Sequence, residues 1–146
     1  MPAYQLLNTT DFVTTLEKEA IINFLLEHLE TYSDSRDNVS RAIEYALSKF
    51  PHQGGFVILA RDADTIIGVC VVNRTNFEGY FAENIIVYLA VGRDDRKQGV
   101  ASELLDKAKV YSKGSVMVRL QQNSSVRTLF EKTGFDQETV EFVLKR

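Results

Sequence analysis

The chain has 146 residues, of which 45% are hydrophobic, and it carries a formal net charge of −3. This length and composition suit a folded protein rather than a disordered one, and we expect a single domain over residues 1–146. A mildly acidic chain is not typical of a general nucleic-acid-binding protein. No apolar run approaches the ~20 residues that span a bilayer. The sequence therefore predicts neither a nucleic-acid partner nor a membrane partner.

The cysteine content and the first residues bear on the cellular compartment. Cys70 is the single cysteine and lies in an apolar run, so it cannot form an intramolecular disulfide. Met1 to Tyr4 lack the basic-then-apolar layout of a secretion signal. We therefore expect a cytoplasmic protein. Two distant histidines, His28 and His52, make no metal-ligand set with this cysteine, and no metal is expected.

Charge is distributed unevenly along the chain. Residues 1–54 contain eight acidic and four basic side chains, whereas residues 55–146 contain twelve and thirteen. This division suits a cationic acceptor beside an anionic cofactor, but solvated helix faces produce the same counts without any function.

The first third of the sequence predicts one short strand and two helices. The strand covers residues 4–7, and a helix capped by Asp11 follows over roughly 12–31. A second helix over about 36–50 ends before a turn at 51–55. Apolar residues repeat at helical spacing in both segments: Ile22, Leu25, Leu26 and Leu29 in the first, and Val39, Ala42, Ile43, Ala46, Leu47 and Phe50 in the second.

Strand patterns dominate the middle of the chain. Residues 56–60 and 66–72 are rich in β-branched side chains and are joined by a short polar segment, which predicts a hairpin. Residues 73–83 are expected to form a loop. Residues 84–91 are apolar at successive positions, which indicates a central strand that is covered on both faces.

The last third alternates helices and strands. We expect a helix over about 99–112, a strand over 115–120, a short helix over 124–132 that Gly134 ends, and a final strand over 139–144. The strands 84–91 and 115–120 should be parallel, because a helix connects them. The complete order predicts an α/β (mixed α+β) fold with a mixed central sheet and helices on both faces.

The segment from Val91 to Ala101 carries the most chemical information. It leaves a buried strand and opens a helix, whose first N–H groups have no intrahelical partner and can bind an anion. Gly99 allows close approach to the backbone, and Arg96 and Lys97 add positive charge. An ordinary strand-to-helix turn with solvated charges explains the segment equally well when it is taken alone.

Two other nucleotide-binding motifs fit this turn poorly. A dinucleotide-binding turn requires three glycines and an acidic residue at the end of the next strand. After Gly92, which directly follows the strand, this turn offers only Gly99, and the next strand ends in Arg119-Leu120-Gln121. A P-loop requires Gly-Lys-Ser/Thr, which the sequence lacks.

Two motifs together resemble those of the GNAT superfamily of N-acetyltransferases. Arg96-Lys97-Gln98-Gly99-Val100-Ala101 is similar to the family's (Gln/Arg)-x-x-Gly-x-(Gly/Ala) signature. Asn123 followed by the segment Leu129 to Phe135 is similar to its second signature, Asn…Leu-Tyr-Glu-Lys-x-Gly-Phe. The resemblance covers residues 55–146 and extends to the first helices by element order.

The resemblance implies an acetyl-CoA-binding site. The cofactor pyrophosphate would lie on the backbone of Arg96, Lys97, Gln98, Gly99, Val100 and Ala101, and the pantetheine arm along Leu89, Ala90 and Val91. Asn123 would contact the arm or the thioester region, and Phe130 would pack beside it. The two N-terminal helices and the loop 73–83 would form the walls of a cleft for a small-molecule or peptide amine.

The resemblance also implies direct attack of a neutral amine on the thioester. Glu83 is the candidate general base, although a solvated loop carboxylate is a slightly more ordinary role for it. The family's usual tyrosine is replaced by Phe130. Water, or the hydroxyl of Tyr88 or Tyr111, could protonate the departing thiolate in its place, and a thiolate is already a tolerable leaving group. A catalytically weak or silent acyl-CoA-binding protein is therefore an alternative, and so is an interaction domain without cofactor. A homodimer is compatible with the sequence.

Overall fold

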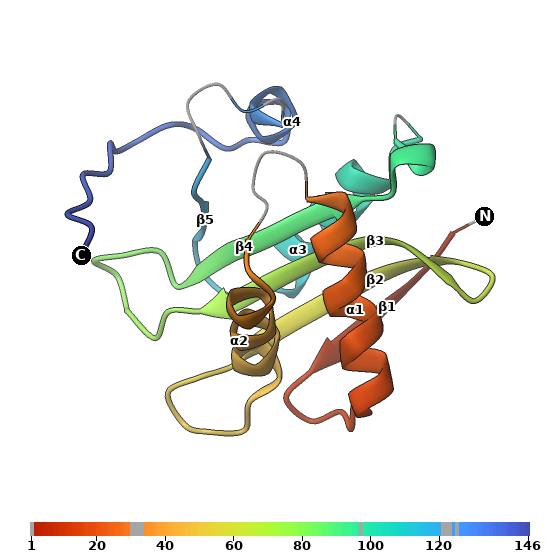
Figure 1. The fold of residues 1–146 in the computed structure, drawn as a ribbon. Coiled ribbons are helices and arrows are strands. Elements are labelled where there is room, and N and C mark those ends of the chain that lie inside the picture. The colour runs from red at the N-terminus through yellow and green to blue at the C-terminus, as the bar shows by residue number, and fades with distance from the viewer. Residues whose placement is uncertain (1, 30–33, 97, 121–123, 125) are drawn as a thin grey trace.

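The structure is a computed structural model that describes residues 2–29, 34–96, 98–120, 124 and 126–146. The described residues form these elements in chain order (Figure 1): β1 (Ala3–Asn8), α1 (Thr15–His28), α2 (Arg36–Leu47), β2 (Gly55–Asp62), β3 (Thr65–Arg74), β4 (Asn84–Val91), the 3-10 helix η1 (Arg93–Asp95), α3 (Val100–Tyr111), β5 (Val116–Val118) and α4 (Arg127–Lys132).

One mixed sheet organises the described residues, and its strand order is β1-β2-β3-β4-β5. The first four strands pair antiparallel with their neighbours, whereas β4 and β5 are parallel. Helices α1 and α2 cover one face, and α3 lies on the other (Figure 1). The predicted fold class, the hairpin and the parallel pair joined by a helix are thereby confirmed.

The core has two layers because the middle strands are buried on both faces. Successive side chains of a strand point to opposite faces. In β3, Val69 and Val71 pack beneath α1 and α2, while Cys70 and Val72 pack beneath α3. Leu104 and Leu105 of α3 complete the second layer and are fully buried. The two layers hold β4 between the helices, at the sheet position where the expected site begins.

Helix α1 begins three residues later than the sequence predicted. Its N-cap is Thr14, whose Oγ1 accepts a hydrogen bond from the Glu17 N–H at 3.1 Å. Asp11 instead accepts from the Asn8 N–H at 2.8 Å, in the turn that ends β1. Asp11 is therefore a turn residue, and the prediction that it caps the helix was wrong.

Two predictions about apolar residues were also wrong. Helix α2 ends at Leu47, and Phe50 is 73% exposed instead of lying on the buried stripe. The backbone before a proline disfavours helix, and Pro51 follows Phe50. Residues 139–144 form no strand, and Val140, Phe142 and Leu144 are exposed. Their alternation has the period of a strand, but a strand also requires a neighbouring edge to pair with.

Among the described residues, no helix combines the length and the apolar character that crossing a membrane requires.

Candidate functional site

The turn between β4 and α3 places an open helix start at the edge of the sheet. The chain leaves β4, passes through η1, and enters α3 at Gly99, whose φ is +81°. Such a left-handed conformation is favourable for glycine and costly for other residues. A Cβ at Gly99 would meet no atom within 4 Å. Space is therefore available directly in front of the helix.

The first turn of α3 offers N–H groups to that space. The first intrahelical bond runs from the Glu103 N–H to the Gly99 carbonyl at 3.0 Å, so the N–H groups of Val100, Ala101 and Ser102 precede the helical ladder. Gly99 provides no side-chain cap. The helix dipole adds positive potential at this end. Geometry and charge both suit an anion such as a phosphate.

Arg96 is held by the protein backbone beside this turn. Its Nε donates to the Val91 carbonyl and its Nη2 donates to the His28 carbonyl, each at 3.2 Å. Arg93 similarly donates to the Glu27 carbonyl at 3.0 Å. Basic side chains commonly bind the free carbonyls at a helix end. These two arginines thus tie the turn to the end of α1, and phosphate binding by the Arg96 side chain stays a prediction.

Strands β4 and β5 pair over only part of their length. Their parallel register joins Asn84 to Val116, Ile85 to Met117 and Ile86 to Val118, and within the described residues it extends no further. On its other edge β4 remains paired to β3 as far as Val91. Arg119 and Leu120 add no further pair to β4, and the positions that would continue the register beyond them lie outside the described residues. No described residue of the β5 side therefore pairs with the β4 backbone after Ile86. This stretch contains Leu89, Ala90 and Val91, the expected pantetheine contacts.

Several expected site residues can be placed and two cannot. Gln98 and Gly99 are exposed, Ala101 is half-buried and Val100 is buried with its side chain in the core. Lys97 and Asn123 lie outside the described residues, so their expected roles stay predictions.

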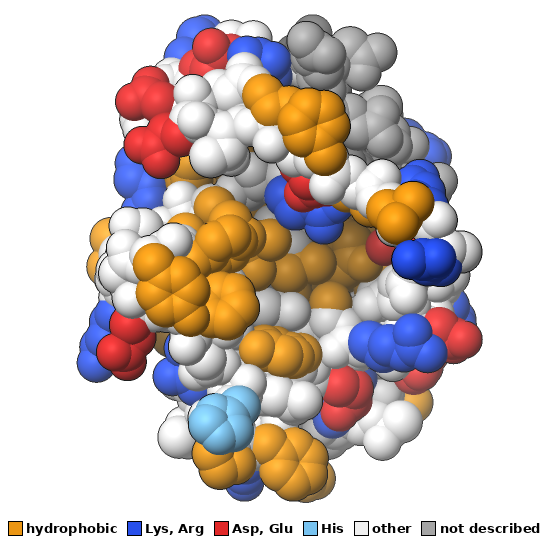
Figure 2. Space-filling model, turned by 90° about the vertical axis from the view of Figure 1, so that its left-hand side faces the viewer, with side chains coloured by type: hydrophobic (Ala, Val, Ile, Leu, Met, Phe, Trp, Pro, Cys, Tyr) orange, Lys and Arg blue, Asp and Glu red, His pale blue; other side chains and the backbone are white. Residues whose placement is uncertain are grey.

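Figure 2 shows a hollow on the side of the molecule that carries the loop between β3 and β4. Hydrophobic side chains line most of its depth, and positively and negatively charged side chains lie at its rim. The hollow offers a largely apolar space with a few polar groups, which is the usual character of a small-molecule site.

Tyr88 is buried on β4 and points toward the connection between α1 and α2. Its hydroxyl donates a 2.8 Å hydrogen bond to Oδ2 of Asp34, just before α2. Burial, together with the bond and the negative charge of Asp34, raises the pKa of Tyr88 above its ordinary value of 10.0. The tyrosine therefore stays protonated at neutral pH, with its proton directed at Asp34. Its expected role as proton donor to a thiolate stays a prediction.

Glu83 fastens the loop before β4 to the start of β5. Its Oε1 accepts from the Ser115 N–H at 2.7 Å, and its Oε2 accepts from the Gly79 N–H at 3.1 Å. The bond from Ser115, followed by that from Gly79, lowers the pKa of Glu83 below its ordinary value of 4.5. A lowered pKa makes a carboxylate a weaker proton acceptor. The structure thus gives Glu83 a structural role, and its role as general base stays a prediction.

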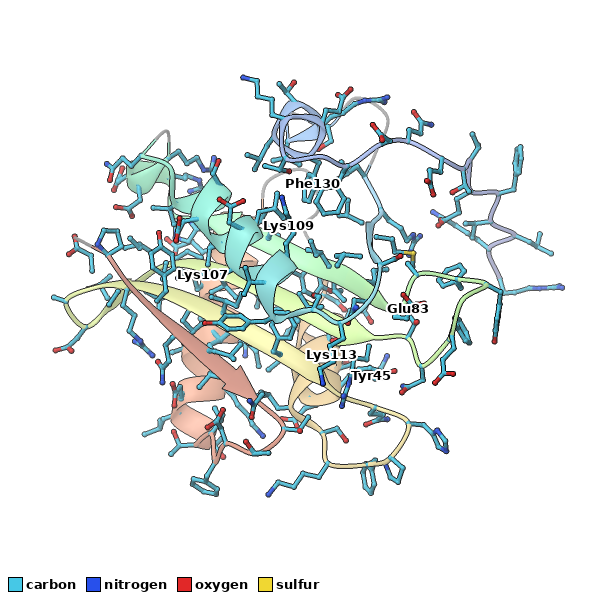
Figure 3. The ribbon with its side chains drawn as sticks, turned by 180° about the vertical axis from the view of Figure 1, so that it is seen from behind. Tyr45, Glu83, Lys107, Lys109, Lys113 and Phe130 are labelled. Carbon is cyan, nitrogen blue, oxygen red and sulfur yellow. The ribbon has the colours of Figure 1, made fainter. Side chains whose placement is uncertain are left out.

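Phe130 closes the end of α4. The Phe135 N–H bonds to the Phe130 carbonyl at 3.0 Å, and the Gly134 N–H bonds to the Glu131 carbonyl at 3.3 Å. This pair of bonds, with Gly134 at φ +99°, is a Schellman motif. The rings of Phe130 and Phe135 pack edge to face at 5.2 Å. Figure 3 shows Phe130 under α4, well apart from Glu83 at the entry to β4.

Sequence reasoning missed the contact of Asp34 with Tyr88 on the central strand. A carboxylate just before a helix is usually a cap or a solvated charge, so no sequence signal distinguishes it. Only the fold brings it to Tyr88. Cys70, by contrast, is fully buried, and burial raises the pKa of its thiol to about 12, which makes a nucleophilic role unfavourable.

Comparison with known proteins agrees with this geometry. A family model described as an acetyltransferase (GNAT) domain matches residues 53–137, which is more than half of the chain. No curated protein matches the sequence significantly.

Several solved structures share the fold. Aminoglycoside N-acetyltransferase AAC(6')-Iy in complex with CoA has a TM-score of 0.71 and 14% identity, with 100% of this chain and 97% of that chain covered. A predicted acetyltransferase with acetyl-CoA from Clostridium acetobutylicum has a TM-score of 0.69 and 15% identity, with 100% of this chain and 96% of that chain covered. Ribosomal-protein-alanine N-acetyltransferase from Brucella melitensis biovar Abortus 2308 has a TM-score of 0.68 and 13% identity, and both chains are fully covered.

Proposed function

Because the chain belongs to the GNAT family of acetyltransferases, we propose that it transfers an acetyl group from acetyl-CoA directly to a primary amine of a small molecule or peptide. The observation that carries this proposal is the open start of α3 at the point where β4 and β5 part. Solved structures of the same fold include complexes with CoA and with acetyl-CoA, which supports acetyl-CoA as the co-substrate.

The described residues fit the two chemical parts of this co-substrate. The N–H groups of Val100, Ala101 and Ser102 suit the pyrophosphate, because a helix start binds phosphate without a side-chain charge. The β4 edge at Leu89 to Val91, with which no described residue of the β5 side pairs, suits the amide groups of the pantetheine arm. Lys97 and Asn123 would add a charge and a polar contact.

The reaction forms a C–N bond and breaks the C–S bond of the thioester. The amine must lose a proton, and an amine with a pKa of ~10.4 costs about 4–5 kcal/mol to hold neutral at neutral pH. Glu83, directly or through water, is the proposed proton acceptor. The departing thiolate, whose thiol has a pKa of ~8.5, takes up a proton from water or from Tyr88.

Phe130 favours a second candidate function. Phenylalanine stands where the resemblance to the family leads one to expect tyrosine, and the ring is 3% exposed and packs against Phe135. A phenyl ring has no proton to give. A weakly active or silent acyl-CoA-binding protein is therefore the alternative to an active enzyme.

Two measurements test these proposals. Acetyl-CoA should raise the melting temperature, because a ligand that binds the folded state at about a hundred times its Kd adds about 2.7 kcal/mol of stability. The absence of any stabilisation would contradict both candidates and leave an interaction domain. Release of free CoA thiol with a panel of amines separates the enzyme from the silent binding protein.

Phe130→Tyr tests the missing proton donor. We expect a several-fold higher kcat, because the phenol would protonate the leaving thiolate. Phe135→Tyr is the matched control, since it adds a hydroxyl to the other ring of the same pair. An unchanged kcat in Phe130→Tyr would show that this protonation does not limit turnover.

The proposed cytoplasmic location rests on the lone, buried Cys70, which indicates no dependence on disulfides. The proposed homodimer rests on the exposed apolar side chains of residues 140–144.

A further inference from the structure

Asp34 presents a carboxylate toward the part of β4 that β5 leaves unpaired. Its Oδ2 accepts from the Tyr88 hydroxyl, and Tyr88 lies two residues beyond Ile86, where the pairing with β5 stops. Asp34 and Tyr88 are 54 positions apart in sequence. This contact therefore joins the α1–α2 connection to the strand along which the thioester is proposed to lie.

The two carboxylate oxygens of Asp34 accept hydrogen bonds from different parts of the fold. Oδ1 accepts from the Ser35 N–H at 2.8 Å and from the Asn38 side chain at 2.7 Å, which stabilises the start of α2. Oδ2 accepts from Tyr88 only, among the contacts of the described residues. A carboxylate offers about four acceptor positions. Three are used, so Oδ2 retains capacity for one more donor.

Asp34 is ionised, and its hydrogen-bond donors among the described residues are all neutral. The bonds from Asn38, Tyr88 and Ser35 lower its pKa below the ordinary value of 3.8, against the opposing effect of partial burial. No lysine, arginine or histidine among the described residues forms an ion pair with it, although other carboxylates such as Glu17 and Glu19 are paired. A half-buried carboxylate with only neutral donors attracts a positive charge.

We propose that Asp34, oriented by Tyr88, binds a second positive charge of the acceptor, so that the preferred substrates are diamines or polyamines. The inference rests on the proposed function. The amine that reacts must be neutral when it attacks, and the charge of Asp34 is of use only to another ammonium group of the same molecule. Asp34 is thus a specificity-determining residue rather than a proton acceptor.

The test compares matched pairs of acceptors. Each pair consists of a linear diamine and the amino alcohol of the same chain length, which share the reacting amine and differ in the distant charge. With the wild-type protein, kcat/KM should favour the diamine about ten- to a hundredfold, the range expected for a hydrogen bond to a charged group.

Asp34→Asn removes the charge and keeps one acceptor oxygen for the Ser35 N–H and the Asn38 side chain at the start of α2, while its NH2 group can donate to the Tyr88 hydroxyl oxygen. It should bring the ratio of diamine to amino alcohol close to one, mainly through KM of the diamine. Asp37→Asn is the matched control, because Asp37 is an exposed acid in the first turn of the same helix. It should leave the ratio unchanged. Tyr88→Phe should lower the ratio of diamine to amino alcohol less than Asp34→Asn does. It removes the hydrogen bond that orients the Asp34 carboxylate but leaves the negative charge of Asp34 in place.

Three outcomes would overturn the inference while leaving the proposed enzyme intact: an equal rate with both members of each pair, an equal effect of Asp34→Asn and Asp37→Asn on the ratio, or acetylation of monoamines alone. If acetyl-CoA stabilises the protein but no diamine is acetylated, the inference also fails. Failure of the proposed function is distinct, because acetyl-CoA would then neither stabilise the wild-type protein nor support thiol release with any amine.

Discussion

Gly99 shows how one residue decides whether a helix start is open. Its left-handed φ and the open space around its missing side chain occur together at the N-cap of α3. Any side chain there would be strained by about 1–2 kcal/mol and would project into the space in front of the helix. The proposed phosphate contact therefore depends on the absence of a side chain.

We expect Gly99→Glu to abolish acetyl-CoA binding, because a carboxylate would occupy the anion site. Isothermal titration should show at least a hundredfold loss of affinity, whereas Gly99→Ala should lose less because it adds strain without charge. Gly79→Glu is the matched control: Gly79 also has a φ of +81° and open space around it, but it lies in the β3–β4 loop. Equal affinities for Gly99→Glu and Gly79→Glu would refute the assigned location.

The predicted roles of other residues differ in how far the structure supports them. Gly99 precedes α3 and Leu89 to Val91 lie on β4 beyond its described pairs with β5, and their roles in binding stay predictions. Glu83 and Arg96 engage backbone groups of the protein itself, which sequence spacing does not reveal. A side chain's partner depends on which segments the fold brings close, and these contacts span up to 68 positions.

At the scale of elements, the position of α3 against the sheet depends on Gly68 of β3. A Cβ at this position would lie 2.9 Å from Leu104 Cδ1 and 3.0 Å from Val100 Cγ1. Both contacts are closer than ordinary van der Waals packing allows. The glycine thus lets α3 lie close to β3, with its first residue, Val100, packed into the core.

We expect Gly68→Ala to lower the free energy of unfolding by about 1–3 kcal/mol through overpacking. It should also weaken acetyl-CoA binding, because α3 must shift at the end that carries the proposed phosphate site. Urea denaturation and titration measure the two effects. Combining Gly68→Ala with Leu104→Ala should cost less than the sum of the single changes, since the smaller side chain leaves room. Strict additivity would show that the two positions do not compete for space.

Elements whose stability is mostly local were predictable from sequence. The β2–β3 hairpin and the β4–α3–β5 unit follow from apolar periodicity and turn residues. The strand expected over residues 139–144 was not confirmed, because alternation gives a strand one apolar face but provides no partner edge. Helix ends were uncertain for a similar reason: Asp11 and Thr14 can both cap a helix, and the turn after β1 decides between them.

At the scale of the whole molecule, the hydrogen bonds accepted by two carboxylates make the free energy of unfolding depend on pH in the acidic range. Asp34 and Glu83 both have a lowered pKa in the folded protein. The folded state therefore binds fewer protons than the unfolded state in the range where these groups titrate. Their contribution is fully present above their ordinary values of 3.8 and 4.5, and it is lost as the pH falls through the lowered values.

We expect the urea midpoint to fall when the pH decreases below about 4.5, and to fall less in Glu83→Gln, which has no carboxylate to protonate. Glu138→Gln is a suitable control, because Glu138 is exposed. An equal decrease in the wild-type protein and in Glu83→Gln would show that the hydrogen bonds from Ser115 and Gly79 do not stabilise the ionised form.

The sequence by itself determined the family, the mixed sheet with helices on both faces, and the glycine turn that opens α3, because each depends on residues close together in the chain. Tertiary structure alone decided that Arg93 and Arg96 bind the end of α1, that Glu83 bonds to the residue before β5, and that Asp34 contacts Tyr88. The physical reason is the sequence separation of the interacting residues. Periodicity and capping involve residues a few positions apart, whereas a charged side chain contacts a distant partner only after the sheet has brought the two segments together.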